Sequence, residues 1–307
     1  MRAMNLKTFA LGIFVTAAGL VSAGDARSDN NAVRGVYGKQ IPDDQIEFVS
    51  TGDHIKAAAA NGAPMMIWEA LEHGEKVECL DCIPSIEPLL YDGNARTREI
   101  AAWWLRRRML GVFGAGEVYE RTLGTLAGDA SPMKRAYAAY AIGEFLATPG
   151  IAACAKATTS DADPMVRAAA ATALGRLNDD GAAGTPVSAL AKAMGDSDAR
   201  VKIAALGAAG RINSFMGVAS IAALTGDGDA TVRRRALELL DAMHAKDSVA
   251  SVLSLAKNDP DANVRAAACH ALGAFRDAST RVPLQAIADS DASSLVRDMA
   301  KIALRSL

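Results

Sequence analysis

The chain has 307 residues, half of them hydrophobic, with 65 Ala and only 15 aromatic residues. This composition excludes collagen, a disulfide-dense miniprotein and global disorder, and it favours helices because Ala is the least costly helical residue. The formal charge is 33 − 35 = −2 and the chain has no basic tail, so a nucleic-acid partner is not expected.

Residues 1–23 have the pattern of an export signal. Arg2 and Lys7 are followed by an apolar run from Thr8 to Leu20, and then by small residues at the positions that a signal peptidase recognises. The alternative, a transmembrane anchor, needs about 20 apolar residues, which is more than this run offers. We therefore expect a secretory signal peptide and no membrane span, in a bacterial protein that is periplasmic or secreted.

Residues 24–50 are polar and without periodicity, and we expect a flexible lead-in. The alternative is a strap that folds onto the body of the protein or onto a partner, anchored by Ile46, Phe48 and Val49. Residues 51–82 follow as an N-terminal helical cap, with helices expected over 51–60 and 64–71.

A phrase of about fifteen residues recurs throughout residues 83–307. Its clearest copies are Asp161 to Gly175 and Asp259 to Gly273, and each copy carries a basic residue six positions after its opening Asp. The basic residue falls at positions 98, 135, 167, 202, 233, 265 and 297. Seven copies at so regular a spacing indicate a repeat array.

Each copy has the features of a helix. The opening Asp is expected to be the N-cap, and apolar residues then recur on one helical face. A second amphipathic segment, such as 248–256, lies between successive copies. One unit is thus two antiparallel helices, and because a lone pair cannot bury its apolar face, the units are expected to stack into a solenoid.

The consensus Asp-x-Asp-x-x-Val-Arg-x-x-Ala-x-x-Ala-Leu-Gly is similar to the HEAT repeat, in the short form called the phycobilisome-lyase HEAT-like repeat. The resemblance covers about seven units and implies an all-α, right-handed α–α superhelix of the HEAT/armadillo-like type. It also implies that the Val-Arg helix of each unit lines the concave face.

The resemblance further implies a structural ladder of Asp and Arg residues between neighbouring units. Its expected members are Asp161, Arg167, Asp196, Asp227, Arg233, Asp259, Arg265 and Arg297, with Arg98 and Arg135 in the same series. The alternative is an anion-binding stripe of arginines.

No catalytic constellation is evident. The sequence has no Gly-rich phosphate loop and no Gly-x-Ser-x-Gly. The HEAT-like deoxyhypusine hydroxylases bind iron through His-Glu pairs, and this sequence has no His-Glu dipeptide. No residue is recognised that would carry over the reaction of the bilin lyases, so neither a cofactor nor a metal is expected.

Cys79 and Cys82 form the sharpest local motif, a Cys-x-x-Cys. A c-type haem is excluded because Ile83 stands where the haem motif needs His. A structural disulfide, a redox or regulatory thiol pair, and a metal site remain open, although zinc would need two further ligands. Cys154 and Cys269 lie three units apart, too far to bridge each other, and Cys269 is expected to be a buried free thiol.

Aromatic residues gather in the first units, with nine of the fifteen between positions 68 and 145. Trp103 shares its repeat position with Tyr140, His270 and Ile302, which differ too much for a tight core position, whereas Trp104 aligns with core Ala residues. Trp, Tyr and Arg are enriched in binding hot spots. We therefore expect a partner surface at Trp103, Arg106, Arg107 and Tyr140; alternatively, Trp103 packs beneath the chain's own strap or cap.

These observations favour a non-catalytic, exported scaffold or adaptor that binds another protein on its concave face. The alternative is a redox or enzyme-accessory protein that uses Cys79 and Cys82.

Overall fold

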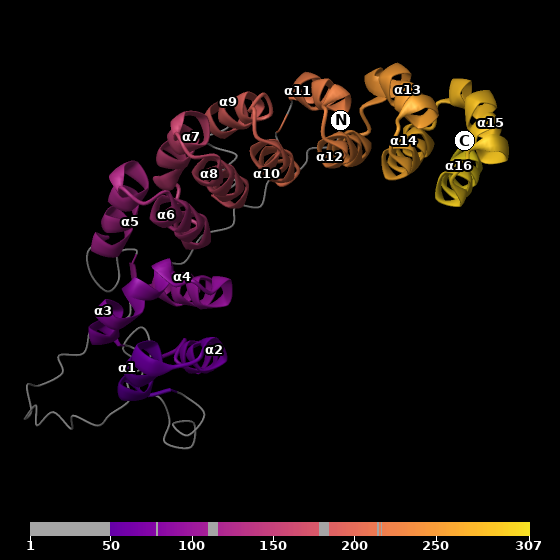
Figure 1. Ribbon diagram of the computed structural model, residues 1–307. Coiled ribbons are helices and arrows are strands. Elements are labelled where there is room, and N and C mark those ends of the chain that lie inside the picture. The colour runs from indigo at the N-terminus through magenta and orange to yellow at the C-terminus, as the bar shows by residue number, and fades with distance from the viewer. Residues whose placement is uncertain (1–49, 78, 110–115, 178–183, 214, 216) are drawn as a thin grey trace, which may run out of the picture.

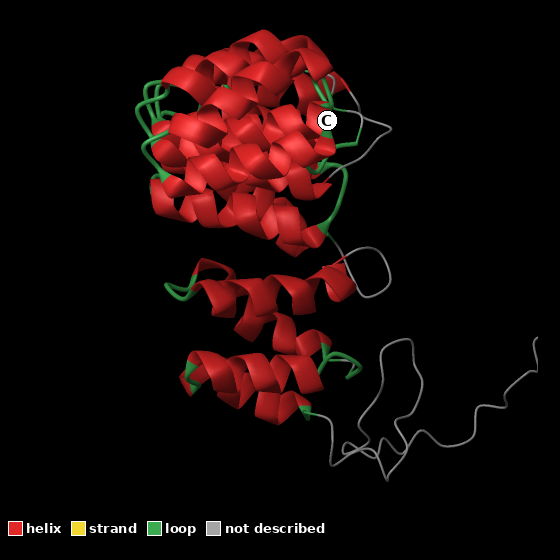
Figure 2. Ribbon diagram, turned by 90° about the vertical axis from the view of Figure 1, so that its right-hand side faces the viewer, coloured by secondary structure: helices red, strands yellow, loops and turns green. Residues whose placement is uncertain are grey.

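The computed structural model describes residues 50–77, 79–109, 116–177, 184–213, 215 and 217–307. The expected signal peptide and nearly all of the expected lead-in lie outside these residues. Within the described part the regular elements are helices, and Figure 2 shows no strand there. None of the described helices is both long enough and apolar enough to cross a membrane.

Helix pairs stack side by side into a curved array (Figure 1), so the predicted all-α solenoid is confirmed. The cap consists of α1 (Gly52–Asn61) and α2 (Pro64–His73). The outer row contains α3 (Ile83–Ile86) with the 3-10 helix η4 (Glu87–Tyr91), α5 (Glu117–Gly128), α7 (Gly150–Ser160), α9 (Gly184–Ala193), α11 (Val218–Ala223), α13 (Val249–Asn258) and α15 (Arg281–Ser290). The inner row contains α4 (Ala95–Met109), α6 (Pro132–Phe145), α8 (Pro164–Leu177), α10 (Ala199–Ala209), α12 (Ala230–Ala242), α14 (Ala262–Phe275) and α16 (Ser294–Ser306). The inner row carries the Val-Arg phrase and follows the concave side of the arc, as expected.

Small residues let successive inner helices approach closely. A Cβ atom added to Gly175 of α8 would lie 2.6 Å from the Cα atom of Ala208 in α10, and one added to Gly273 of α14 would lie 2.8 Å from the Cα atom of Ala303 in α16. Real Cβ atoms do not come that near a backbone atom, so only Gly fits at these positions without a shift. The Ala-rich composition thus follows from the tight spacing of the inner row.

Polar contacts join neighbouring units at the start of the inner helices. Arg167 donates from Nε and Nη2 to the two carboxylate oxygens of Asp196 in the next unit, at 2.6 and 2.9 Å. Its Nη1 donates to the backbone carbonyl of Asp161, the opening Asp of its own unit, at 2.9 Å. We call each contact between the basic residue of one unit and the opening Asp of the next a rung. Bidentate arginine rungs join Arg135 to Asp161, Arg167 to Asp196, Arg233 to Asp259, and Arg265 to Asp291.

Three of the seven recurring basic positions differ from this pattern. Lys202 makes a single contact of 2.5 Å with Asp227, because an ammonium has no fork of nitrogens. Arg297 keeps the backbone half of the contact, to the carbonyls of Asp291 and Ala292, but the described chain has no later unit to supply a carboxylate. Arg98 forms no ion pair within the described residues.

The opening Asp is not the N-cap, so that prediction is wrong. Asp227 lies at the end of the preceding 3-10 helix, and its carboxylate accepts a hydrogen bond from the N–H group of Asp229. Asp229 is the N-cap of α12 and accepts hydrogen bonds from the N–H groups of Thr231 and Val232. The residue two positions after the opening Asp therefore caps the helix, as Asp261 does for α14 and Ser131 for α6.

The N-terminal cap is attached to α4 by a buried arginine. Arg108 is 2% exposed and donates to the backbone carbonyls of Trp104, Gly74 and Val77 at 2.7–3.1 Å. Its guanidinium lies 3.6 Å from the ring centroid of Trp104, which is fully buried as the sequence predicted. Burial lowers the pKa of Arg108 to about 10, so the side chain still carries its charge at neutral pH.

Substitution of Gly175 by Ala is expected to lower the free energy of unfolding by about 1–3 kcal/mol, because the new methyl group overpacks the contact between α8 and α10. Gly207→Ala is the matched control: nothing lies within 4 Å of its added Cβ, and removing a helical Gly should stabilise by about 0.5–1 kcal/mol. Urea unfolding followed by circular dichroism measures both values. Equal effects of the two substitutions would contradict the close approach.

The rungs predict a loss of stability in acid. Hydrogen bonds from Arg167 hold the pKa of Asp196 below its ordinary value, so the stabilisation is present above the unfolded-state pKa of about 3.9 and is lost as the pH falls through the lower, folded-state pKa. Asp196→Asn should destabilise the protein at pH 7 by about 2 kcal/mol and flatten the fall in melting temperature below pH 4. Asp298→Asn, which removes an exposed ion pair with Lys301, is the control and should change little.

Candidate protein-binding groove

The concave face is built from one recurring position of the inner helices, five residues after the basic residue of each unit. Its occupants are Trp103, Tyr140, Thr172, Gly207, Glu238, His270 and Ile302, and all of them are exposed or half-buried. Tyr140 is 41% exposed and Ile302 50% exposed. The position therefore faces the groove and not the core.

A cavity of about 290 Å³ opens on this face between α4 and α6. Arg98 and Glu99 line it from α4, Tyr137, Tyr140 and Glu144 line it from α6, and Arg176 lines it from α8. The cavity thus combines two aromatic rings with charges of both signs, which suits a polar side chain of a partner.

Glu144 and Arg176 form an ion pair at the wall of this cavity. Burial raises the pKa of Glu144; Arg176 and Arg106 act against that shift, while the negative charge of Glu99 adds to it. Because Arg176 pairs with Glu144, these two charges largely offset each other.

The structure divides the four predicted partner residues between two places. Tyr140 lines the cavity, and the positive charge of Arg106 acts to lower the pKa of Glu144, which also lines it. Trp103 is half-buried against the N-terminal core, with the guanidinium of Arg107 6.0 Å from its ring centroid. Arg107 also pairs with Glu75 of the cap at 2.6 Å. Trp103 thus packs in part against the N-terminal core, as one predicted alternative had it, and the partner surface stays a prediction.

Sequence reasoning missed the contact between Arg98 and Tyr137. The guanidinium carbon of Arg98 lies 3.8 Å from the ring centroid of Tyr137. Tyr137 stands two residues after the basic residue of its unit, where Ala169, Ala204 and Ala267 stand in others. An aromatic residue at a position that is Ala in three units was the available signal.

A second pair on the concave face was also missed. His270 Nδ1 lies 2.7 Å from a carboxylate oxygen of Asp241, which holds the ring in one orientation. Asp241 occupies a position that is Gly in four other units, and the pair borders a hollow lined also by Leu295 and Met299.

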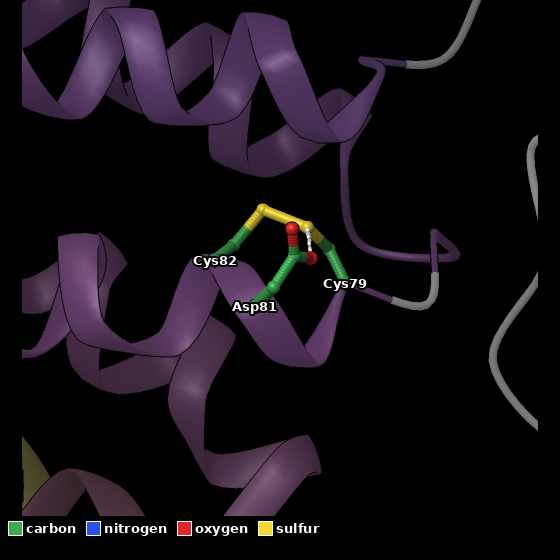
Figure 3. Close-up of side chains that lie close together, drawn as sticks. All are labelled: Cys79, Asp81 and Cys82. Atoms are coloured by element: carbon green, nitrogen blue, oxygen red, sulfur yellow. Dashed lines mark hydrogen bonds between the residues drawn. A yellow bond between two sulfur atoms is a disulfide. The ribbon is translucent and has the colours of Figure 1, made fainter. Parts of the chain in front are cut away.

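Cys79 and Cys82 are joined by a disulfide in the cap (Figure 3). The two residues are 5% and 0% exposed, and a Cβ atom added to Gly52 of α1 would lie 2.8 Å from the sulfur of Cys79. Helix α1 therefore covers the disulfide closely.

Asp81 Oδ1 lies 3.0 Å from the Cys79 sulfur, and the carboxylate of Asp81 pairs with Lys56. The donor atoms of Cys79, Asp81 and Cys82 lie within 4.8 Å of one another, but sulfur binds metal as a thiolate. In the disulfide form, therefore, only the carboxylate of Asp81 could act as a metal ligand.

Cys154 and Cys269 are buried free thiols. Burial raises the pKa of each to about 12, so neither is a reactive thiolate at neutral pH.

Comparison with known proteins places this geometry among solenoids. A family model of HEAT repeats matches residues 120–185 and 217–305. No curated protein matches the sequence significantly.

Several solved structures are similar to this chain. The Escherichia coli protein YibA is 18% identical with a TM-score of 0.56, over 88% of this chain and 99% of that one. Yeast importin-beta, Kap95p, in a structure concerned with its binding to RanGDP, is 14% identical with a TM-score of 0.60, over 83% of this chain but 38% of the matched chain. The complex of CpcE and CpcF of phycocyanin lyase from Nostoc is 20% identical with a TM-score of 0.40, over 72% of this chain and 86% of that one. At these identities the likeness concerns the fold.

Thiol labelling of the native full chain should modify none of its four cysteines, because two are in a covered disulfide and two are buried. Denaturation should expose two thiols, and denaturation with a reductant should expose four, as counted by mass spectrometry after alkylation. Two thiols that react rapidly in the native protein, mapped to Cys79 and Cys82, would instead indicate an accessible redox pair.

Proposed function

The chain belongs to the HEAT repeat family, and from that premise we propose that it is a protein-binding scaffold or adaptor that receives its partner on the concave face near α4 and α6. HEAT solenoids bind proteins, as Kap95p binds RanGDP, and the curved inner row offers a continuous surface for such a contact. The observation that carries the proposal is the cavity lined by Tyr140 and four charged side chains on that face.

The proposed anchors have the properties of a hot spot. Tyr140 presents an exposed ring beside polar groups, and Trp103 presents the exposed part of a ring whose remainder is held by packing. Rigid aromatic side chains lose little conformational entropy on binding, which is why a few of them carry much of the affinity of an interface.

We further propose that the protein acts outside the cytoplasm, in the periplasm or as a secreted protein. The support is the signal-like pattern of residues 1–23 and the Cys79–Cys82 disulfide, since disulfides persist in oxidising compartments.

The redox alternative gains no support from the surroundings of the cysteine pair. Thiol–disulfide exchange requires a thiolate to reach one of the sulfur atoms, and α1 lies against them both.

The double substitution Trp103→Ala with Tyr140→Ala should reduce recovery of the bound partner by tenfold or more, because truncation of hot-spot residues removes most of their contact energy. The measurement is affinity purification of the tagged full chain from its native host with quantitative mass spectrometry. N-terminal sequencing of the same material should find Gly24 as the first residue if residues 1–23 are removed as proposed.

Val282→Ala is the control, because Val282 is 79% exposed on the outer helix α15. Tyr140→Ala alone guards against a loss of folding, since Tyr140 is exposed whereas Trp103 contacts the N-terminal core. Equal partner recovery from the wild type, the double variant and the control would reject a partner surface at these residues.

A further inference from the structure

No rung forms at the first junction of the array, between the unit of α4 and the unit of α6. Arg98 makes the backbone half of the usual contact, donating from Nη1 to the carbonyls of Asp92 and Gly93 at 2.6 and 3.0 Å. Asp129 stands where the next unit should supply the carboxylate, and its Oδ1 accepts from the N–H group of Ser131 as in other units. Yet no ion pair joins Arg98 to Asp129, or to any other acid among the described residues.

The backbone contacts of Arg98 use Nη1 and leave Nε and Nη2, which are the nitrogens that bind carboxylates on the other arginine rungs. On four other rungs, Nε and Nη2 of the arginine hold both oxygens of an Asp at 2.6–3.0 Å. No protein partner of Nε or Nη2 of Arg98 is found among the described residues. The chain therefore repeats one carboxylate-binding arrangement, and among the described residues it is open at Arg98 as well as at Arg297 of the last unit.

The stacking of Tyr137 accompanies the missing rung and also fixes the guanidinium of Arg98. The ring of Tyr137 lies 3.8 Å from the guanidinium carbon of Arg98, and three of the other units have the much smaller Ala at this position. Stacking on an aromatic face leaves the in-plane N–H groups of a guanidinium free to donate. The stack and the two backbone hydrogen bonds hold Arg98 in place before any ligand arrives.

Arg98 and Tyr137 line the 290 Å³ cavity of the groove. From these contacts we infer that the cavity receives an acidic side chain of the partner protein, whose carboxylate binds Nε and Nη2 of Arg98. This inference rests on the proposed function for the partner as a protein and adds the chemistry of the residue that enters.

The other charges in the cavity are compatible with this ligand. Arg176 is paired with Glu144, so that pair contributes little net charge. Glu99 is exposed and has no ion-pair partner among the described residues. Its negative charge therefore repels an acidic side chain in the cavity and attracts a basic one. The cavity favours the acid because the guanidinium of Arg98 is held in position by three contacts, whereas the side chain of Glu99 makes no hydrogen bond or ion pair within the described residues.

Two synthetic peptides test the inference directly. One carries three Glu residues and the other three Lys residues in the same Gly/Ser frame, with both termini blocked, and each is titrated into the full chain at low salt by isothermal calorimetry and NMR. The Glu peptide should bind the wild type. Arg98→Lys should weaken that binding about tenfold, because Lys keeps the charge but loses the bidentate fork.

Two further variants sharpen the result. Glu99→Gln should strengthen binding of the Glu peptide, since it removes the opposing charge. Arg265→Lys is the matched control, because that arginine is already paired with Asp291, and it should leave peptide binding unchanged. Thermal unfolding of each variant checks that the fold is retained.

Three results would overturn the inference. The first is no binding of the Glu peptide to the wild type. The second is binding of the Lys peptide that Glu99→Gln abolishes, which would assign the cavity to a basic side chain. The third is binding of the Glu peptide only after Asp129→Asn, which would show that Asp129 occupies the fork in solution.

The outcome is separable from that of the proposed function. Partner recovery that is lost in the Trp103 and Tyr140 double variant but unchanged in Arg98→Lys would keep the scaffold and reject the acidic ligand. Peptide binding that depends on Arg98, with partner recovery unchanged in the double variant, would keep the carboxylate site and reject those two anchors.

Discussion

The bidentate contact between an arginine and the opening Asp of the next unit links most of the array. Three of the four Asp residues on these rungs bind two arginines at once: the carboxylate of Asp161 binds Arg135 of the unit before, and its carbonyl accepts from Arg167 of its own unit. Asp259 does the same between Arg233 and Arg265. The fixed fork of the guanidinium constrains both the distance and the rotation between units, so the rungs help to set the curvature of the concave face. The rungs act together with the Gly–Ala approaches of the inner row, which bring the backbones to the distance at which the forks reach.

The candidate site lies where this regularity fails. The apolar core is divided into two clusters near α6, with Ala141 and Phe145 in the N-terminal cluster and Ala138 and Ile142 in the cluster of the array. At the same joint Arg98 stacks on Tyr137 in place of forming a rung, and the cavity opens beside them. A repeat that completes all its internal contacts offers a partner few unpaired polar groups, so the incomplete joint is where binding chemistry remains available.

The N-terminal cap is held by other means than the ladder. Arg108 donates to carbonyls of the segment after α2, and the disulfide of Cys79 and Cys82 lies under α1. These contacts suit a helix pair that has a neighbouring unit on only one side among the described residues, since stacking there stabilises only one of its faces.

The repeat phrase by itself determined the solenoid and the number of units, and its resemblance to the HEAT repeat implied that the Val-Arg helices line the concave face. The solenoid follows from a local period of apolar residues, which forces helix pairs to bury their faces against each other. The exposed position of Tyr140 and the burial of Trp104 were also predictable, because aligned units report which positions tolerate different residues. The tertiary structure alone decided which Asp caps a helix and which binds an arginine, since the two stand two residues apart in every clear copy. It alone decided that Arg98 lacks a rung, because that depends on the distance between α4 and α6 and on the ring of Tyr137 between them. Contacts between units depend on the angle at each joint, and a sequence period carries no record of that angle.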